Sequence, residues 1–146
     1  MVVLSIARLR QWAERAEIKL SDGSTRIEQP DGAFDNFVSN YVFDLLAPEY
    51  VADIVSEAHR MLGNNGKLCL VSLGQGESGV SRILPAAWES IWRIKPELVG
   101  GCRPIDLRRL VKVEQWSIER YETVTSLGIT SEVVVASPRL GFKTTA

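Results

Sequence analysis

The sequence has few of the features that mark disulfide-rich, metal-binding or membrane proteins. It contains two cysteines, Cys69 and Cys102, and one histidine, which is too few for a disulfide framework or a structural zinc site. No apolar run approaches the ~20 residues of a membrane-spanning helix. The first residues show neither the basic start nor the small-residue cleavage site of a signal peptide. We therefore expect a cytoplasmic protein without a metal or membrane site.

Positive charge is not in excess either. The 17 Lys and Arg residues are balanced by 18 Asp and Glu residues, for a net charge of −1, and they form no basic block. Because nucleic-acid binding needs a basic surface, nucleic acid is not expected as the main partner. The hydrophobic share of 45% is that of an ordinary globular chain. We expect a single domain over residues 1–138 and a tail over 139–146.

Helical and strand patterns alternate along the chain. In order, they predict a helix over 4–16, strands over 17–20 and 34–40, a helix over 48–62, a strand over 67–73, helices around 80–93 and from Pro104, and strands within 115–124 and 131–137. Strands separated by helices indicate parallel βαβ units, and the short connection "TSLGIT" indicates a closing antiparallel hairpin. The sequence thus predicts an α/β fold with a mostly parallel sheet.

Two stretches carry a family resemblance. "PDGAFDNFVSNYVFDLL" (30–46) and "EAHRMLGNNGKLCLVSL" (57–73), followed by the hairpin, resemble the later part of the class I S-adenosylmethionine-dependent methyltransferase domain. In that family a strand beginning "FD" precedes a helix that ends "RxLxxGG". Here Gly66 is the second glycine, and Asn65 replaces the first. The resemblance covers roughly residues 1–137 and implies a Rossmann-like fold with S-adenosylmethionine as cofactor.

The family's glycine-rich cofactor loop has no counterpart near the start of the sequence. That loop follows the first strand of the family's domain, and no such segment precedes residue 4. Val3 stands where the family places an acidic residue for the ribose. The resemblance therefore implies a truncated domain without its first strand and helix. Such a domain is expected to be inactive alone, or to depend on a complementary polypeptide.

A second glycine-rich segment lies later in the chain. "GQGESG" (74–79) spells the G-x-G-x-x-G pattern of dinucleotide-binding loops. That pattern needs a further strand with an acidic residue about 20 residues on, but "RIKPELVGGCRP" (93–104) has no strand character. We interpret 74–79 as a loop near the substrate rather than a phosphate-binding loop, and a nucleotide-binding module is the weakest alternative.

The resemblance also implies which residues form the site. Ser39, Asn40 and Tyr41 lie at the carboxyl end of the "FD" strand, where the family contacts the methionine part of the cofactor and the substrate. Turn and helix-capping roles are equally open for them. Asp22 and Gly23 fall where the family contacts adenine, although "SDGS" is also an ordinary turn.

Other polar residues receive weaker assignments. Asp44 is expected on the same rim, either as a substrate-binding residue or in a solvated or helix-N-terminal role. Arg103, in a substrate loop, can bind a carboxylate or phosphate. Cys102 has no histidine nearby to activate it, and His59 is expected to be a packing residue. Asp35 lies at the end of its strand away from ligands. No catalytic residue is assigned.

Two kinds of function remain open from the sequence. The first is a methyltransferase-like protein that acts on a small-molecule acceptor. The second is a non-catalytic binding or interaction module derived from a methyltransferase. Because a sheet without its central strands exposes an apolar edge, we expect a homo-oligomer, for example a homodimer.

Overall fold

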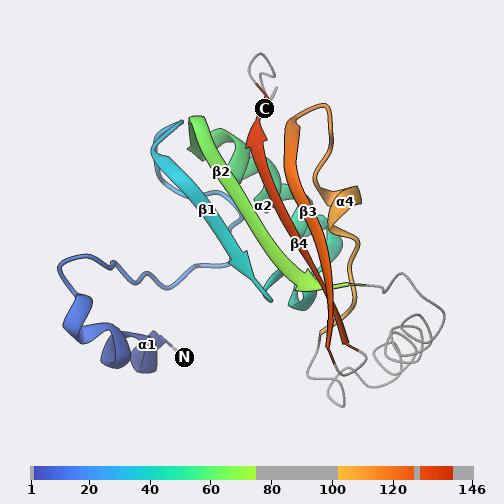
Figure 1. The fold of residues 1–146 in the computed structure, drawn as a ribbon. Helices are drawn as coiled ribbons and strands as arrows, with labels where there is room; N and C mark the ends of the chain where they lie inside the picture. Colours follow the sequence, from blue (N-terminus) through green and yellow to red (C-terminus); the bar gives the residue numbers. More distant parts are fainter. Residues whose placement is uncertain (1, 75–101, 127–128, 140–146) are drawn as a thin grey trace.

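A four-stranded sheet forms the centre of the protein (Figure 1). The structure, a computed structural model, describes residues 2–74, 102–126 and 129–139. The strands lie in the order β1-β2-β4-β3, with bounds Phe34–Asn40 for β1, Leu62–Leu73 for β2, Trp116–Ser126 for β3 and Ile129–Pro138 for β4. The predicted α/β fold is confirmed, and β1 has the predicted bounds.

The prediction of a mostly parallel sheet is only partly right. β1 and β2 pair in parallel, whereas β4 pairs antiparallel with both β2 and β3. Three strands thus share one direction, but the returning strand of the hairpin lies between two of them. The hairpin itself was predicted correctly. Inserting its second strand next to β2 converts two of the three pairings to antiparallel.

The observed helices match the predicted ones in some places and differ from them in others. α2 (Pro48–Met61) ends one residue before the predicted limit, with Pro48 in its first turn. The predicted helix over 4–16 is shorter, consisting of α1 (Val2–Leu9) and the 3-10 helix η1 (Arg10–Trp12). Residues 17–20 do not form the predicted strand, since no described strand pairs with them and Leu20 is 79% exposed. The predicted helix at 80–93 lies outside the described residues.

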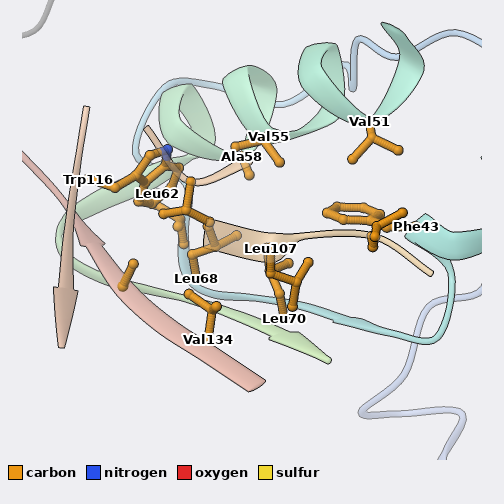
Figure 2. Close-up of a cluster of buried hydrophobic side chains, with 13 residues drawn as sticks. Phe43, Val51, Val55, Ala58, Leu62, Leu68, Leu70, Leu107, Trp116 and Val134 are labelled. Carbon is orange, nitrogen blue, oxygen red and sulfur yellow. The ribbon is translucent and has the colours of Figure 1, made fainter. Parts of the chain in front are cut away.

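α2 covers one face of the sheet and encloses the core (Figure 2). Val51, Val55 and Ala58 point from the helix toward Leu68 and Leu70 of β2. All five side chains are buried. Burying a Val or Leu side chain fully stabilises the fold by roughly 1.5–3 kcal/mol. The spacing of the apolar residues on α2 therefore fixes which face of the helix meets the sheet.

The chain leading into β1 is attached to α2 by Arg60. Its guanidinium donates hydrogen bonds to the carbonyl oxygens of Ile27 and Gln29 and to the carboxylate of Asp31, at 3.0, 2.8 and 2.6 Å. The Ile27 N–H donates in turn to Glu57 at 2.8 Å. This network fixes where β1 begins relative to the helix.

Two further short helices complete the described part. η2 (Phe43–Leu45) follows β1, and α4 (Leu107–Leu110) precedes β3. The Asp106 side chain caps α4 by accepting a hydrogen bond from the Arg109 N–H. Both helices lie beside the covered face, where Phe43 and Leu107 join the core (Figure 2).

Candidate functional site

The parallel strands β1 and β2 end at the same edge of the sheet (Figure 1). In open α/β sheets, ligands bind beyond the carboxyl ends of parallel strands. Residues 102–107 cross this edge. The Arg103 N–H donates to the Asp44 carbonyl at 2.9 Å, and the Ile105 N–H donates to the Leu73 carbonyl at 2.8 Å. This edge, bounded by η2 and the crossing segment, is the candidate site.

Tyr41 follows the last residue of β1 in an unfavourable backbone conformation. Its φ of 51° lies in the left-handed region, which is uncommon for a bulky residue. Two hydrogen bonds hold it there: its N–H donates to the Val71 carbonyl at 2.9 Å, and its hydroxyl pairs with the Ser131 Oγ at 2.7 Å. Strain of this kind concentrates at functional sites. Tyr41 thus joins β1, β2 and β4 at the candidate site.

Two buried serines lie close to this edge on the covered face of the sheet. Ser39 precedes the end of β1, next to Leu70 of β2, and Ser72 follows Leu70 by two residues. Their exposed fractions are 7% and 0%, and neither Oγ has a hydrogen-bond partner among the described residues. Since buried hydroxyls are normally bonded, two unpartnered ones indicate a place for a ligand or water.

Asp44 lies in η2, the short helix that follows β1. Its side chain is 2% exposed, and its Oδ1 atom lacks a partner within the described part of the chain. Burial and the Asp44 charge together raise the pKa of the Cys102 thiol above its ordinary value. A raised pKa keeps this thiol protonated, so the environment disfavours Cys102 as a nucleophile.

Glu132 on β4 completes the polar residues of the edge. It is directly opposite Ser72 and buried, and its Oε2 accepts a hydrogen bond from the Leu107 N–H at 2.9 Å. A Cβ atom on Gly74 would lie 2.7 Å from the Glu132 Cγ, so any larger residue here would force the Glu132 side chain to shift. The sequence analysis missed Glu132, Ser72 and the role of Gly74. The alternation of β4 was the available signal, since it places Glu132 on the same face as Val134.

Arg103 reaches η2 rather than open solvent. Its Nη2 and Nε donate to the Leu46 carbonyl at 2.9 and 3.3 Å. These bonds, with the bond from its N–H to Asp44, fasten the crossing segment to η2. The assignment of Arg103 to substrate binding stays a prediction.

Asp22 and Gly23 form an exposed turn in the chain before β1. The Ser24 N–H donates to the Asp22 Oδ1 at 2.8 Å, and Gly23 has a φ of 92°. No hydrogen bond among the described residues joins this turn to the carboxyl ends of the strands. The assignment of the turn to adenine binding stays a prediction. Asn40 ends β1 beside Val71 and is exposed.

The remaining polar residues lie elsewhere. The His59 Nε2 atom lies 3.1 Å from the Gln115 carbonyl, and the ring meets Trp116 edge-on. Burial lowers the pKa of His59, as expected for a packing residue. Asp35 is exposed in the first half of β1. Among the described residues, no group of three or more His, Cys, Asp or Glu is placed to hold a metal ion. None of the described helices has the length and apolarity to cross a membrane.

Comparisons with known proteins agree with this geometry. Residues 2–70 match the family described as "Methyltransferase domain". No curated protein matches the chain. Among solved structures, a protein from Pyrococcus horikoshii OT3 has a TM-score of 0.69 at 14% identity, over 94% of this chain and 66% of that one. The chain thus spans just under two thirds of that protein.

Two further solved structures carry methyltransferase names. A putative methyltransferase from Bacillus halodurans has a TM-score of 0.63 at 14% identity, over 92% of this chain and 78% of its own. Geranyl diphosphate C-methyltransferase from Streptomyces coelicolor A3(2), solved with S-adenosyl-L-homocysteine, has a TM-score of 0.65 at 12% identity, over 93% and 58%. Residues 2–70 are thus similar to a methyltransferase family, and the chain shares the fold of solved structures that carry methyltransferase names.

Proposed function

We propose that the protein is a methyltransferase-like domain whose carboxyl-edge site binds S-adenosylmethionine weakly by itself. In this proposal the site transfers the methyl group to a small-molecule acceptor only together with a complementary polypeptide. The observation that carries the proposal is that the buried Ser39 and Ser72 hydroxyls, near the ends of β1 and β2, have no hydrogen-bond partner among the described residues, while Tyr41 after β1 has a strained backbone. It is supported by the position of this site at the edge where open α/β sheets bind ligands.

The residues present fit part of the cofactor. Ser39, Asn40 and Tyr41 would hold its amino-acid part, since the unpartnered Ser39 hydroxyl offers a hydrogen bond there. Asp22 and Gly23 would approach the adenine. When bound, S-adenosylmethionine supplies an electrophilic methyl group. The chain's own task is then to orient the acceptor against that group and to exclude water, because methyl transfer depends mainly on positioning.

Dependence on a partner rests on the sequence before β1. Only Gly23 and Gly32 occur in that segment, and both are isolated. A phosphate or carboxylate cradle made of successive backbone N–H groups needs a glycine-rich turn. The family resemblance supplies the expectation that such a turn belongs to the full site, and the proposal places that turn outside residues 1–33. In this proposal the chain alone does not transfer methyl groups.

Calorimetric titration of the purified chain tests this proposal. We expect S-adenosylmethionine and S-adenosylhomocysteine to bind more weakly than ~100 μM, because in this proposal the glycine-rich turn is supplied elsewhere. Micromolar binding by the chain alone would contradict the dependence on a partner. Methylation of an acceptor by the chain alone would do so too.

A second candidate function is a homo-oligomeric interaction module. β1 pairs only with β2 among the described strands, so its other edge is unpaired. Val38 at that edge is 69% exposed. Unpaired apolar edges tend to associate with other chains. We expect light scattering at micromolar concentration to give the mass of a dimer or larger assembly. A monomer mass, unchanged by Val38→Lys, would contradict this candidate.

A further inference from the structure

The segment that contains α1 and η1 presents an exposed apolar side. We call residues 2–16 the N-terminal arm. Ile6, Leu9 and Trp12 follow one another at a spacing of three residues, which places helical side chains along one side. They are 50%, 40% and 48% exposed, and the arm stands apart from the sheet (Figure 1). Contiguous exposed apolar side chains mark an interaction surface.

A second apolar surface lies along β1. A groove of about 190 Å³ is lined by residues that include Ile27, Phe34, Phe37, Val38 and Met61. Ile27, Phe34 and Val38 are exposed. β1 pairs only with β2 among the described strands, so one of its edges is unpaired and open to association. We call this surface the β1 groove.

The two surfaces carry opposite charge. The arm contains three arginines, all exposed, and a single acidic residue. These arginines are Arg8, Arg10 and Arg15. Residues 27–38, which supply most of the groove lining, contain three exposed carboxylates and neither Lys nor Arg. Asp31 already pairs with Arg60, so Glu28 and Asp35 are the carboxylates offered to a partner. Complementary charges of this kind favour and orient a contact.

The segment between the arm and the β1 groove is long enough for the arm to reach a second copy of the chain. Residues 16–26 form no helix or strand, and a segment of this length spans up to roughly 35 Å when extended. From Ile27 onward the chain is held to α2 by Glu57 and Arg60. Since the arm stands away from the sheet of its own chain, two copies can cover both surfaces by exchanging arms. Such a reciprocal contact closes as a symmetric dimer.

We propose that the β1 groove of one copy binds the N-terminal arm of a second copy, so that two copies exchange arms. The proposal rests on the second candidate function, a homo-oligomeric interaction module, and names the two surfaces that meet. Leu9 and Trp12 are the apolar anchors, because large apolar side chains at the centre of a contact carry most of its binding energy. The arginines of the arm meet Glu28 and Asp35 at the rim of the groove.

Two variants at exposed positions test the exchange by sedimentation velocity. We expect Leu9→Glu in the arm, and Val38→Lys in the groove, each to raise the dimer Kd at least tenfold. A mixture of the two variants retains one intact arm and one intact groove, so it should associate at least tenfold more tightly than either variant alone. Val113→Glu, at an exposed valine between α4 and β3, is the matched control and should leave the Kd unchanged.

A separate pair of variants tests the charge contribution. Asp35→Asn should raise the dimer Kd severalfold, and the effect should shrink at high salt. Asp53→Asn, at an exposed position of α2, should leave the Kd unchanged. Equal Kd values for the two variants would overturn the placement of the arm in the β1 groove.

The remaining outcomes separate this proposal from the second candidate function. A dimer that is unchanged in Leu9→Glu, or a mixture no tighter than its components, would overturn the arm exchange and leave that function standing. A monomer at every concentration would overturn both. A monomer whose melting temperature falls in Leu9→Glu would show that the arm binds the groove of its own chain, which contradicts the exchange.

Two further measurements keep the test decisive. If Val38→Lys does not fold, Ile27→Lys takes its place, since Ile27 is an exposed residue of the groove lining. Its mixture with Leu9→Glu is expected to associate in the same way. Binding of a monomeric parent chain to anionic phosphatidylserine vesicles, lost in Leu9→Glu, would assign the arm to a lipid surface and overturn the proposal.

Discussion

Arg60 and Glu57 form a two-point ion pair on α2. The Arg60 Nη2 lies 2.6 Å from the Glu57 Oε1, and the Arg60 Nε lies 2.9 Å from the Glu57 Oε2. Both side chains are largely buried, at 16% and 10% exposed. The same guanidinium holds the carbonyls of Ile27 and Gln29. One residue thus positions the chain that leads into β1.

Replacing Arg60 should destabilise the protein and loosen the segment before β1. We expect Arg60→Met to lower the free energy of unfolding by about 2–4 kcal/mol, because several charge-assisted bonds are lost and Glu57 is left unpaired. Arg109→Met is the matched control. Arg109 pairs with Asp106 at the surface, so its replacement should change the stability by less than ~0.5 kcal/mol. Urea unfolding measures both, and equal losses would contradict the assignment.

The same ion pair predicts the acid sensitivity of the fold. The hydrogen bond from Arg60 lowers the pKa of Glu57 below its ordinary value of 4.5. The unfolded chain therefore binds the proton more readily than the folded chain. The contribution of Glu57 is fully present above pH 4.5 and is lost as the pH falls through the lowered folded pKa. Glu57→Gln should show a shallower loss of stability below pH 4.5. If Glu57→Gln lost stability below pH 4.5 as steeply as the parent chain, this role of Glu57 would be contradicted.

Gly74 should not tolerate a methyl group. In Gly74→Ala the new Cβ would lie 2.7 Å from the Glu132 Cγ, so Glu132 must move and lose its bond to the Leu107 N–H. We expect a loss of about 1–3 kcal/mol. At Gly63, by contrast, a Cβ would meet the nearest atom, the Gly32 carbonyl oxygen, at an ordinary 3.6 Å. Gly63→Ala should therefore be close to neutral. Thermal unfolding distinguishes the two, and a neutral Gly74→Ala would show that Glu132 has room to move.

We expect the left-handed backbone of Tyr41 to matter for ligand binding rather than for stability. Tyr41→Gly relieves a left-handed backbone that costs about 1–2 kcal/mol, which offsets the lost hydroxyl bond of about 1 kcal/mol. We expect unchanged stability within ~1 kcal/mol together with weaker binding of S-adenosylhomocysteine. Tyr50 lies at an exposed position of α2. Tyr50→Gly should lower the free energy of unfolding by about 1 kcal/mol without changing the binding of S-adenosylhomocysteine. If Tyr41→Gly bound S-adenosylhomocysteine as well as the parent chain does, Tyr41 would not be part of the binding site.

The sequence pattern predicted the helices and strands that depend mainly on their own residues, and it failed for those that depend on distant contacts. The spacing of apolar residues in α2 is enough to define this helix, because it buries one face against the sheet. The strand predicted at 17–20 fails because four residues without a partner strand cannot stay extended in a sheet. The insertion of β4 next to β2 depends on contacts far apart in the sequence.

The candidate site was predicted in part for the same reason. Ser39, Tyr41 and Asp44 follow directly from the end of β1, so their position at the edge can be read from the sequence. Ser72 and Glu132 meet only because β4 returns beside β2. Their role depends on the crossing of residues 102–107, and no local pattern encodes that crossing.

The most direct test of the account is a residue-resolved NMR titration of the ¹⁵N-labelled chain with millimolar S-adenosylhomocysteine. The account predicts chemical-shift changes at Ser39 to Tyr41, at Asp44 and at Ser72, with an affinity weaker than ~100 μM. Shift changes absent from these residues, or confined to segments far from the carboxyl ends of β1 and β2, would contradict it.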